Sequence, residues 1–213
     1  MARQAVLVRE REMLDAAARR LIDPPLHRTA RVLAGLGVDA NTVTLLGFCA
    51  GIASFPALIW QQDIMALACI VLNRLADGLD GAIARIRGAT DLGGFLDIVL
   101  DFIVYAGVPV AFAIGRPEHA LAAAVLVFSF VGTMASFLAF AIIAAKRGLT
   151  TSRRGAKSIY YLGGIAEGSE TILFLALICL FPDAFAWFAG IFAVACWLTT
   201  AGRVAAAVNT FAR

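Results

Sequence analysis

The chain has 213 residues, of which 61% are hydrophobic and 15% charged, and its formal net charge is +3. A soluble domain has about 45–50% apolar and about 25% charged residues, so an ordinary soluble protein is excluded. The length favours one domain, and we expect no nucleic-acid partner.

Residues 1–40 precede the first long apolar block and mix apolar with basic side chains. Two short amphipathic helices are predicted there, separated by the helix-breaking sequence Asp23-Pro24-Pro25, and we expect both to lie on the membrane surface. A merely solvated arm is the alternative. The first block comes too late for a cleavable signal peptide. The apolar positions of the two helices are Val8, Met13, Leu14, Leu21 and Ile22, then Leu26, Val32, Leu33 and Leu36.

Residues 41–213 contain six apolar segments, each long enough for a membrane-spanning helix of about 20 residues. Backbone polar groups in lipid must be satisfied within the segment, so each segment is predicted to be a helix. The expected fold is therefore an all-α integral membrane bundle of six transmembrane helices with an N-terminal cytoplasmic amphipathic segment. The six spans run approximately over 42–60, 64–84, 94–115, 119–145, 165–182 and 184–206.

Basic residues indicate the orientation of these spans. Nearly all of the 18 lysines and arginines lie on the side that carries both termini, whereas Arg116 lies in a loop on the other side and Arg74 within a span. The positive-inside rule then places both termini in the cytoplasm, in a membrane of the bacterial inner-membrane type.

The first predicted span contains a GxxxG pair, Gly47 and Gly51. Small residues at this spacing let two membrane helices approach closely, either within one chain or between two chains. A homodimer is therefore one of the two interpretations.

Four aspartates lie where the second predicted span ends and the third begins: Asp77, Asp80, Asp97 and Asp101. Ionised carboxylates near lipid are costly and are by default functional candidates. The spacings of three and four residues place each pair on one helix face. Consecutive spans joined by a short loop run antiparallel, so all four carboxylates are expected to converge on one cytoplasmic pocket.

Four converging carboxylates repel one another unless cations intervene. Their hard oxygen atoms favour Mg²⁺, Mn²⁺ or Ca²⁺, and two divalent ions would balance the four charges and could clamp a diphosphate. Gly78 and Gly81 would let a ligand approach the helix backbone closely. Arg85, at the cytoplasmic edge, suits a phosphate. The simpler interpretation is neutralisation of the aspartates by Arg74, Arg85 and Arg87.

This stretch resembles the signature of the CDP-alcohol phosphotransferase family, DxxDGxxAR followed after seven or eight residues by GxxxDxxxD. Every defined position is present, with seven residues between Arg85 and the second glycine. Six spans and a cytoplasmic surface helix are also similar to that family. The matching residues are Asp77, Asp80, Gly81, Ala84, Arg85, Gly93, Asp97 and Asp101.

The resemblance implies roles for all of these residues except Gly93. Asp77, Asp80, Asp97 and Asp101 would bind Mg²⁺ or Mn²⁺, with two ions expected, and Asp97 and Asp101 would be catalytic. Asp101 is the candidate general base for the acceptor hydroxyl. The CDP moiety would contact Asp77, Gly81, Ala84 and Arg85.

The family also tends to carry a TPN-type sequence at the start of the first span. Here the sequence is Asp39-Ala40-Asn41-Thr42-Val43-Thr44, with alanine in the proline position. Asn41 and Thr44 are therefore either further CDP contacts or helix caps.

The acceptor is less clearly marked in the sequence. Relatives that make inositol phospholipids carry GGFxERxER, and this chain keeps both glycines (Gly163, Gly164) and both glutamates but neither arginine. The candidate acceptor-binding residues are Arg153, Arg154, Lys157, Glu167, Glu170 and Arg203. Anionic lipid head groups are alternative ligands for the basic residues among them.

The resemblance implies transfer of a phosphatidyl group from a CDP-alcohol such as CDP-diacylglycerol, with release of CMP. The acceptor would be a small hydroxylated molecule such as glycerol 3-phosphate, serine, inositol or an inositol phosphate. A prenyltransferase is disfavoured because its two aspartate motifs lie far apart in sequence. A membrane cation transporter or channel is the alternative from another class, but it would place acidic sites at mid-bilayer.

Overall fold

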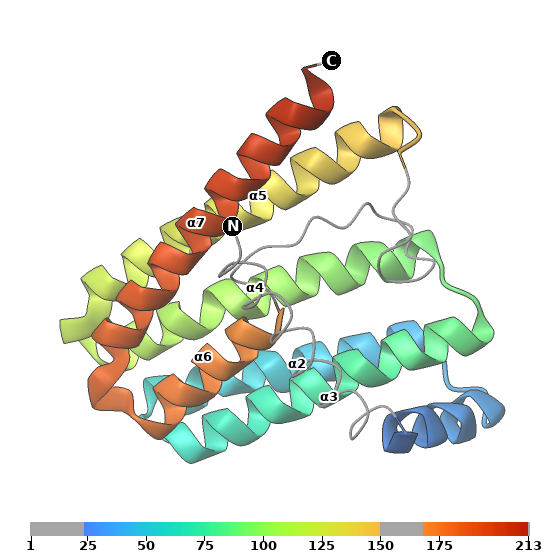
Figure 1. Cartoon of the computed structure of the whole chain (residues 1–213). Coiled ribbons are helices and arrows are strands. Elements are labelled where there is room, and N and C mark those ends of the chain that lie inside the picture. Colours follow the sequence, from blue (N-terminus) through green and yellow to red (C-terminus); the bar gives the residue numbers. More distant parts are fainter. Residues whose placement is uncertain (1–23, 150–167, 213) are drawn as a thin grey trace. The chain divides into compact units, whose positions relative to one another are not determined.

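The computed structural model describes residues 24–149 and 168–212 of the chain. Within each of these two ranges the residues fold into α-helices joined by short turns, and no strand occurs among them (Figure 1). A first helix covers 24–35. The others are α2 (Ala40–Ile59), α3 (Asp63–Arg87), α4 (Asp91–Gly115), α5 (Ala120–Lys146), α6 (Gly168–Leu180) and α7 (Phe185–Phe211), with the 3₁₀ turns η1 (Pro117–His119) and η2 (Pro182–Ala184).

Helices α2 to α7 occur where the sequence predicted six spans, but within residues 24–149 and 168–212 only four stretches are both long and apolar enough to cross a membrane. These are Ala40–Ile59, Asp91–Gly115, Pro117–Lys146 and Pro182–Phe211. Helix α3 has the length, at 25 residues, but it carries the charged residues of the aspartate stretch. Helix α6 has only 13 residues, and the preceding part of the predicted fifth span lies outside the described residues.

Many large apolar side chains are exposed on these helices. Trp60, Leu121, Phe128 and Trp187 each expose more than 60% of their surface. Soluble monomers rarely leave so much apolar surface in water, and tryptophan is enriched where a membrane meets water. The exposed apolar surface and the four long helices are those of an integral membrane protein.

The chain packs as two compact units. The first comprises the described parts of Met1–Cys49 together with Leu72–Leu100, and the second comprises Ala50–Val71 together with the described parts of Asp101–Arg213. The boundaries fall inside α2, α3 and α4, so each of these helices contributes one segment to each unit.

In the first unit the helix over 24–35 packs on α2 and α3. Ala30, Val43, Ala82 and Ile83 form the buried cluster, flanked by apolar side chains that include Leu26 and Leu33. Arg28, Arg31 and Val32 of this helix are exposed. Its role as the second predicted amphipathic helix on a membrane surface stays a prediction. The first predicted one lies outside the described residues.

In the second unit α5 and α7 lie side by side (Figure 1). Phe192 of α7 contacts aromatic rings of both neighbouring helices. It packs edge-on against Phe130 of α5 and stacks on Phe174 of α6. At one end of this unit Phe112 stacks on Phe185, with ring centroids 4.2 Å apart.

Turns at the same end of the second unit are held by polar contacts. The Gln61 side-chain amide donates a hydrogen bond of 2.8 Å to the Gly115 carbonyl. Arg116 pairs with Asp63 at 2.6 Å, and its guanidinium lies over the Phe112 ring. These contacts fasten the α2–α3 turn to the turn after α4.

Candidate active site

The predicted site residues of α3 lie in its C-terminal half, inside the first unit. Asp77 is half-buried, and Asp80, three residues later, is 6% exposed. Ala84 is half-buried and Arg85 is exposed at the end of the helix. Within two turns of α3 the charged groups change from the buried carboxylate of Asp80 to the exposed guanidinium of Arg85. This change is expected where a helix passes from a protein interior toward water.

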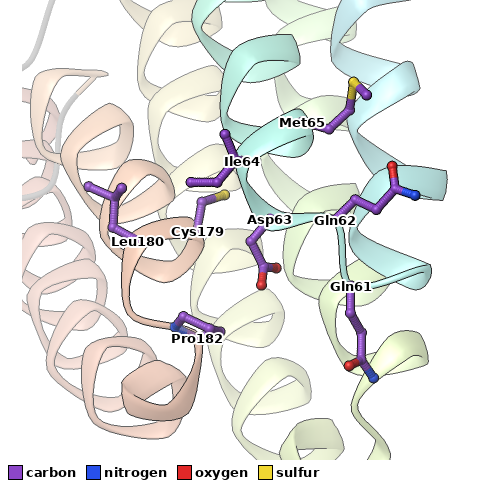
Figure 2. Close-up of a pocket in the computed structure, with 8 residues that line it drawn as sticks. All are labelled: Gln61, Gln62, Asp63, Ile64, Met65, Cys179, Leu180 and Pro182. Atoms are coloured by element: carbon purple, nitrogen blue, oxygen red, sulfur yellow. The ribbon is translucent and has the colours of Figure 1, made fainter.

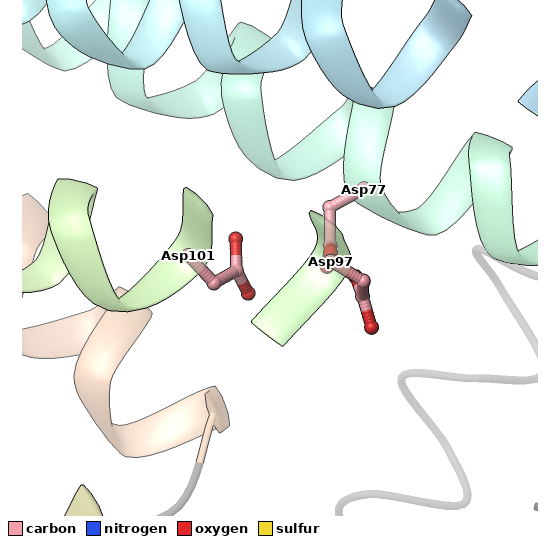
Figure 3. A group of neighbouring side chains, drawn as sticks. All are labelled: Asp77, Asp97 and Asp101. Atoms are coloured by element: carbon pink, nitrogen blue, oxygen red, sulfur yellow. The ribbon is translucent and has the colours of Figure 1, made fainter. Parts of the chain in front are cut away.

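Three of the four predicted metal ligands come together. Asp77, Asp97 and Asp101 each offer a carboxylate oxygen, and the three oxygens lie within 4.8 Å of one another (Figure 3). Asp77 and Asp97 belong to the same unit, and Asp101 follows Asp97 by one turn of the continuous helix α4. Asp80 is not in this group of three.

The donor set of this cluster fits a divalent cation. Three carboxylates at this separation repel one another unless a cation or protons intervene, and carboxylate oxygens are the ligands that Mg²⁺ and Mn²⁺ prefer. Asp97 is exposed, so the cluster is open to ions from solution. The arrangement is thus chemically suited to hold a hard metal ion beside an anionic substrate.

Asn73, a residue not expected from the sequence to belong to the site, forms a hydrogen-bonded pair with Arg74 one turn before Asp77. Asn73 is buried, and its side-chain nitrogen donates 2.9 Å to the Gly47 carbonyl of α2. Its side-chain oxygen accepts from Nε and Nη2 of Arg74 at 2.9 and 2.7 Å. Nη1 of Arg74 lies 3.6 Å from Oδ2 of Asp77. The i, i+3 spacing is a partial signal, because it places Arg74 and Asp77 on one helix face, and Arg74 was among the arginines considered for neutralising the aspartates.

A second residue missed from the sequence is Tyr105. Its hydroxyl donates a hydrogen bond of 3.2 Å to Oδ2 of Asp101, one turn earlier in α4. The i, i+4 spacing could have revealed this pair. The bond restricts the orientation of the carboxylate that is predicted to act as the base.

The glycines near the aspartates differ in what surrounds them. A Cβ at Gly81 would lie 3.5 Å from Nη1 of Arg85, an ordinary contact, so the Arg85 side chain lies beside this glycine. A Cβ at Gly78 would lie 3.0 Å from Leu26. The space expected for a ligand at Gly78 is therefore taken by the N-terminal helix, and that glycine serves packing.

Of the two predicted CDP contacts of the first span, Asn41 lies close to the start of α4. Asp39, rather than Asn41, caps α2, because its carboxylate accepts from the Asn41 backbone at 3.1 Å. The Asn41 side-chain oxygen lies where it would be 2.9 Å from a Cβ at Gly93. Thr44 donates to the Ala40 carbonyl at 3.1 Å, a bond within its own helix. The structure therefore brings Asn41 next to a signature glycine, whereas Thr44 is engaged within α2.

Of the candidate acceptor-binding residues, Arg153, Arg154, Lys157 and Glu167 lie outside the described residues. Glu170 is half-buried in the first turn of α6. Arg203 of α7 is 8% exposed and donates 2.8 Å to the Thr133 carbonyl of α5, with its guanidinium over the Phe137 ring. In this conformation Arg203 joins two helices of the second unit.

A pocket of about 440 Å³ opens at the start of α3, and the side chains that line it include Gln62, Asp63, Met65 and Cys179 (Figure 2). It contains none of the predicted site residues. Asp63 is engaged by Arg116, so this pocket carries no chemistry related to the aspartate stretch.

Comparison with known proteins places the chain in one family. The family model of CDP-alcohol phosphatidyltransferases matches residues 38–207. The inner membrane protein YnjF of Escherichia coli K12 is 52% identical over 193 residues, which cover 90% of this chain and 94% of that protein. The phosphatidylinositol phosphate synthase of Mycobacterium marinum is 30% identical over 166 residues, covering 75% of this chain and 64% of the synthase.

Two crystal structures of the phosphatidylinositol phosphate synthase of Mycobacterium tuberculosis share the fold. The structure with CDP-DAG bound has a TM-score of 0.67 at 22% identity and covers 84% of this chain and 91% of that chain. The complex with manganese and citrate has a TM-score of 0.61 at 23% identity and covers 84% of this chain and 87% of that chain. From its aspartate signature, its helical fold and the match over residues 38–207, the chain belongs to the CDP-alcohol phosphatidyltransferase family.

Proposed function

We propose that this phosphatidyltransferase uses CDP-diacylglycerol as donor and transfers its phosphatidyl group to the hydroxyl of a small polar acceptor. The observation that carries the proposal is the convergence of Asp77, Asp97 and Asp101 within the family signature. The acceptor oxygen attacks the β-phosphorus, the bond from that phosphorus to the bridging oxygen breaks, and CMP leaves. The membership in a transferase family weighs against the transporter alternative.

Asp77, Asp97 and Asp101, with Asp80 as a fourth ligand, would hold Mg²⁺ or Mn²⁺, and we propose two ions. When bound, divalent ions neutralise the diphosphate and stabilise the charge that develops on it. A relative's structure contains manganese, which supports the choice of metal. Asn41, Thr44, Gly81, Ala84 and Arg85 would contact the CDP moiety.

Asp101 accepts the proton of the acceptor hydroxyl, and Asp97 lies beside it as metal ligand and catalytic partner. The Tyr105 hydroxyl donates to Oδ2 of Asp101 and would orient this carboxylate. Positioning of the two substrates supplies much of the remaining rate enhancement.

The proposed topology has six spans, with α3 and α6 added to the four apolar helices. Helix α3 has 25 residues, which at about 1.5 Å per residue exceeds a hydrocarbon core of about 30 Å. Apart from Asp63 in its first turn, its charged residues lie from Arg74 onward, toward the proposed cytoplasmic side. Both termini and the site would face the cytoplasm, residues 1–40 would lie along the inner-membrane surface, and 41–213 would form the transferase domain.

The proposed homodimer would have to form through a surface that does not include Gly47. A Cβ at Gly47 would lie 2.6 Å from the Ala76 Cβ, so this half of the GxxxG pair packs within the chain.

The similarity to a phosphatidylinositol phosphate synthase favours a phosphorylated inositol as the acceptor. Against this acceptor, Gly168 and Thr171 occupy the two positions where the inositol-lipid motif has arginines. The remaining candidates are glycerol 3-phosphate, serine and inositol. Arg153, Arg154, Lys157, Glu167, Glu170 and Arg203 are the residues proposed to bind the acceptor.

The test is an acceptor screen on the purified full chain. CDP-diacylglycerol and Mg²⁺ or Mn²⁺ are supplied with inositol 1-phosphate, inositol, glycerol 3-phosphate or serine, and the lipid product is identified by mass. One acceptor should give a new phospholipid together with stoichiometric CMP, and Asp97→Asn should give neither. If folded protein forms no product and no CMP with any acceptor, and instead conducts cations in proteoliposomes, the proposal is wrong.

A further inference from the structure

Arg74 of α3 is a buried cation placed one turn before the candidate metal ligand Asp77. Its side chain is 8% exposed, and its Nη1 lies 3.6 Å from Oδ2 of Asp77. Burial lowers the effective dielectric around the guanidinium, so its charge acts strongly on neighbouring ions. Arginine stays protonated at every physiological pH.

The Arg74 guanidinium is fixed independently of Asp77. Nε and Nη2 both donate to the Asn73 side-chain oxygen, at 2.9 and 2.7 Å. Asn73 is 4% exposed and is itself held on the Gly47 carbonyl at 2.9 Å. All four residues belong to the first compact unit. The guanidinium is therefore expected to stay in place when a metal ion binds to Asp77.

A fixed positive charge beside a metal ligand has opposite effects on the two charged species that use the site. It repels a divalent cation bound to Asp77, and it attracts an anionic diphosphate brought to that cation. We propose that Arg74 is a built-in positive charge that strengthens binding of the donor diphosphate at the expense of metal affinity. This role rests on the proposed function of the site and adds a specificity-determining residue outside the aspartate signature.

The two effects of removing the charge should have opposite signs. For Arg74→Gln we expect Mn²⁺ to bind about threefold more tightly and CDP about tenfold more weakly. Arg74→Lys keeps a charge near the same place and should stay within about twofold of wild type in both affinities. A variant with general structural damage would weaken both, so the pair of signs separates the electrostatic role from a structural one.

The experiment uses the purified full chain in detergent and requires no turnover. Mn²⁺ binding is measured by electron paramagnetic resonance of the free ion, and CDP binding by calorimetry at saturating Mn²⁺. Arg74→Met is a second uncharged variant, with an apolar side chain suited to a buried helix position, in case Arg74→Gln folds poorly. Arg87→Gln is the matched control, because Arg87 is an arginine of the same helix that donates to the Val38 carbonyl at 2.8 Å. About three turns separate it from Asp77, beyond a Debye length of about 8 Å.

The inference is overturned if the uncharged Arg74 variants bind Mn²⁺ more weakly or equally, or if their CDP affinity is unchanged. It is also overturned if Arg87→Gln shows the same pair of shifts. Wild-type protein that binds no Mn²⁺, or an Asp97→Asn variant that binds it normally, would instead contradict the proposed function itself. The two failures are therefore distinguishable.

Discussion

Gly47 of α2 lies directly against Ala76 of α3, so closely that a Cβ at position 47 would stand 2.6 Å from the Ala76 Cβ. Ala76 precedes Asp77, and the Gly47 carbonyl accepts the Asn73 hydrogen bond. This close helix approach therefore fixes the register of the turn that carries the first metal ligand. Small residues commonly allow membrane helices to approach closely, and here Gly47 and Ala76 do so within one chain.

Gly47→Val should force α2 and α3 apart. Overpacking of a filled contact costs about 1–3 kcal/mol, so we expect a lower thermal unfolding midpoint together with weaker Mn²⁺ binding. Gly190→Ala is the control, since nothing lies within 4 Å of a Cβ built there. Equal midpoints for Gly47→Val and wild type would show that the helices do not pack as described.

The neighbouring glycines Gly93 and Gly94 offer a matched pair of substitutions. A Cβ at Gly93 would lie 2.9 Å from Oδ1 of Asn41 and 3.0 Å from Oγ1 of Thr90, whereas nothing lies within 4 Å at Gly94. The Gly93 backbone also donates to Thr90 at 3.0 Å, a bond that caps α4.

Gly93→Ala should therefore disturb the start of α4 and lower the rate of CMP release about tenfold, whereas Gly94→Ala should stay near wild type. Initial rates with CDP-diacylglycerol measure both. Equal losses at the two positions would contradict the assignment of Gly93 to the contact with Asn41 and Thr90.

Tyr105→Phe removes only the hydroxyl that bonds to Asp101. Loss of a group that orients a catalytic carboxylate typically costs about tenfold or more in activity or metal affinity, so we expect about a tenfold lower rate of CMP release. The ring is retained, so the thermal unfolding midpoint should stay close to that of wild type. An unchanged rate of CMP release would show that the hydrogen bond from Tyr105 does not contribute to the function of Asp101.

The pair of Arg116 and Asp63 is predicted to act on stability alone. The two side chains are 11% and 16% exposed and meet at 2.6 Å. Removing one partner of a buried ion pair costs on the order of 3 kcal/mol, because the other charge is left without compensation. Arg116→Met should thus lower the unfolding midpoint, and the double variant Asp63→Asn with Arg116→Met should regain part of the loss. Rates at a temperature where all variants are folded should be equal.

The sequence predicted the positions of the helices, and three of the four carboxylates that it predicted to converge lie together, for simple reasons. Long apolar runs can only be helices in lipid, and the spacing from Asp97 to Asp101 places both on one face of α4. The contact from Asn73 to Gly47 was not predictable, because it depends on how two helices are rotated about their axes. The same applies to Gly78, whose open face is covered by Leu26, and to Arg203, whose guanidinium bonds to Thr133.

Release of CMP from CDP-diacylglycerol by the purified full chain, with and without divalent metal, tests the central claim most directly. We expect release with Mg²⁺ or Mn²⁺ and an acceptor, none after chelation, and recovery when metal is restored. Asp97→Asn and Asp101→Asn should each lower the rate about a hundredfold or more while the protein stays folded. Release that persists after chelation, or that both variants retain at the wild-type rate, would contradict a metal-dependent aspartate site.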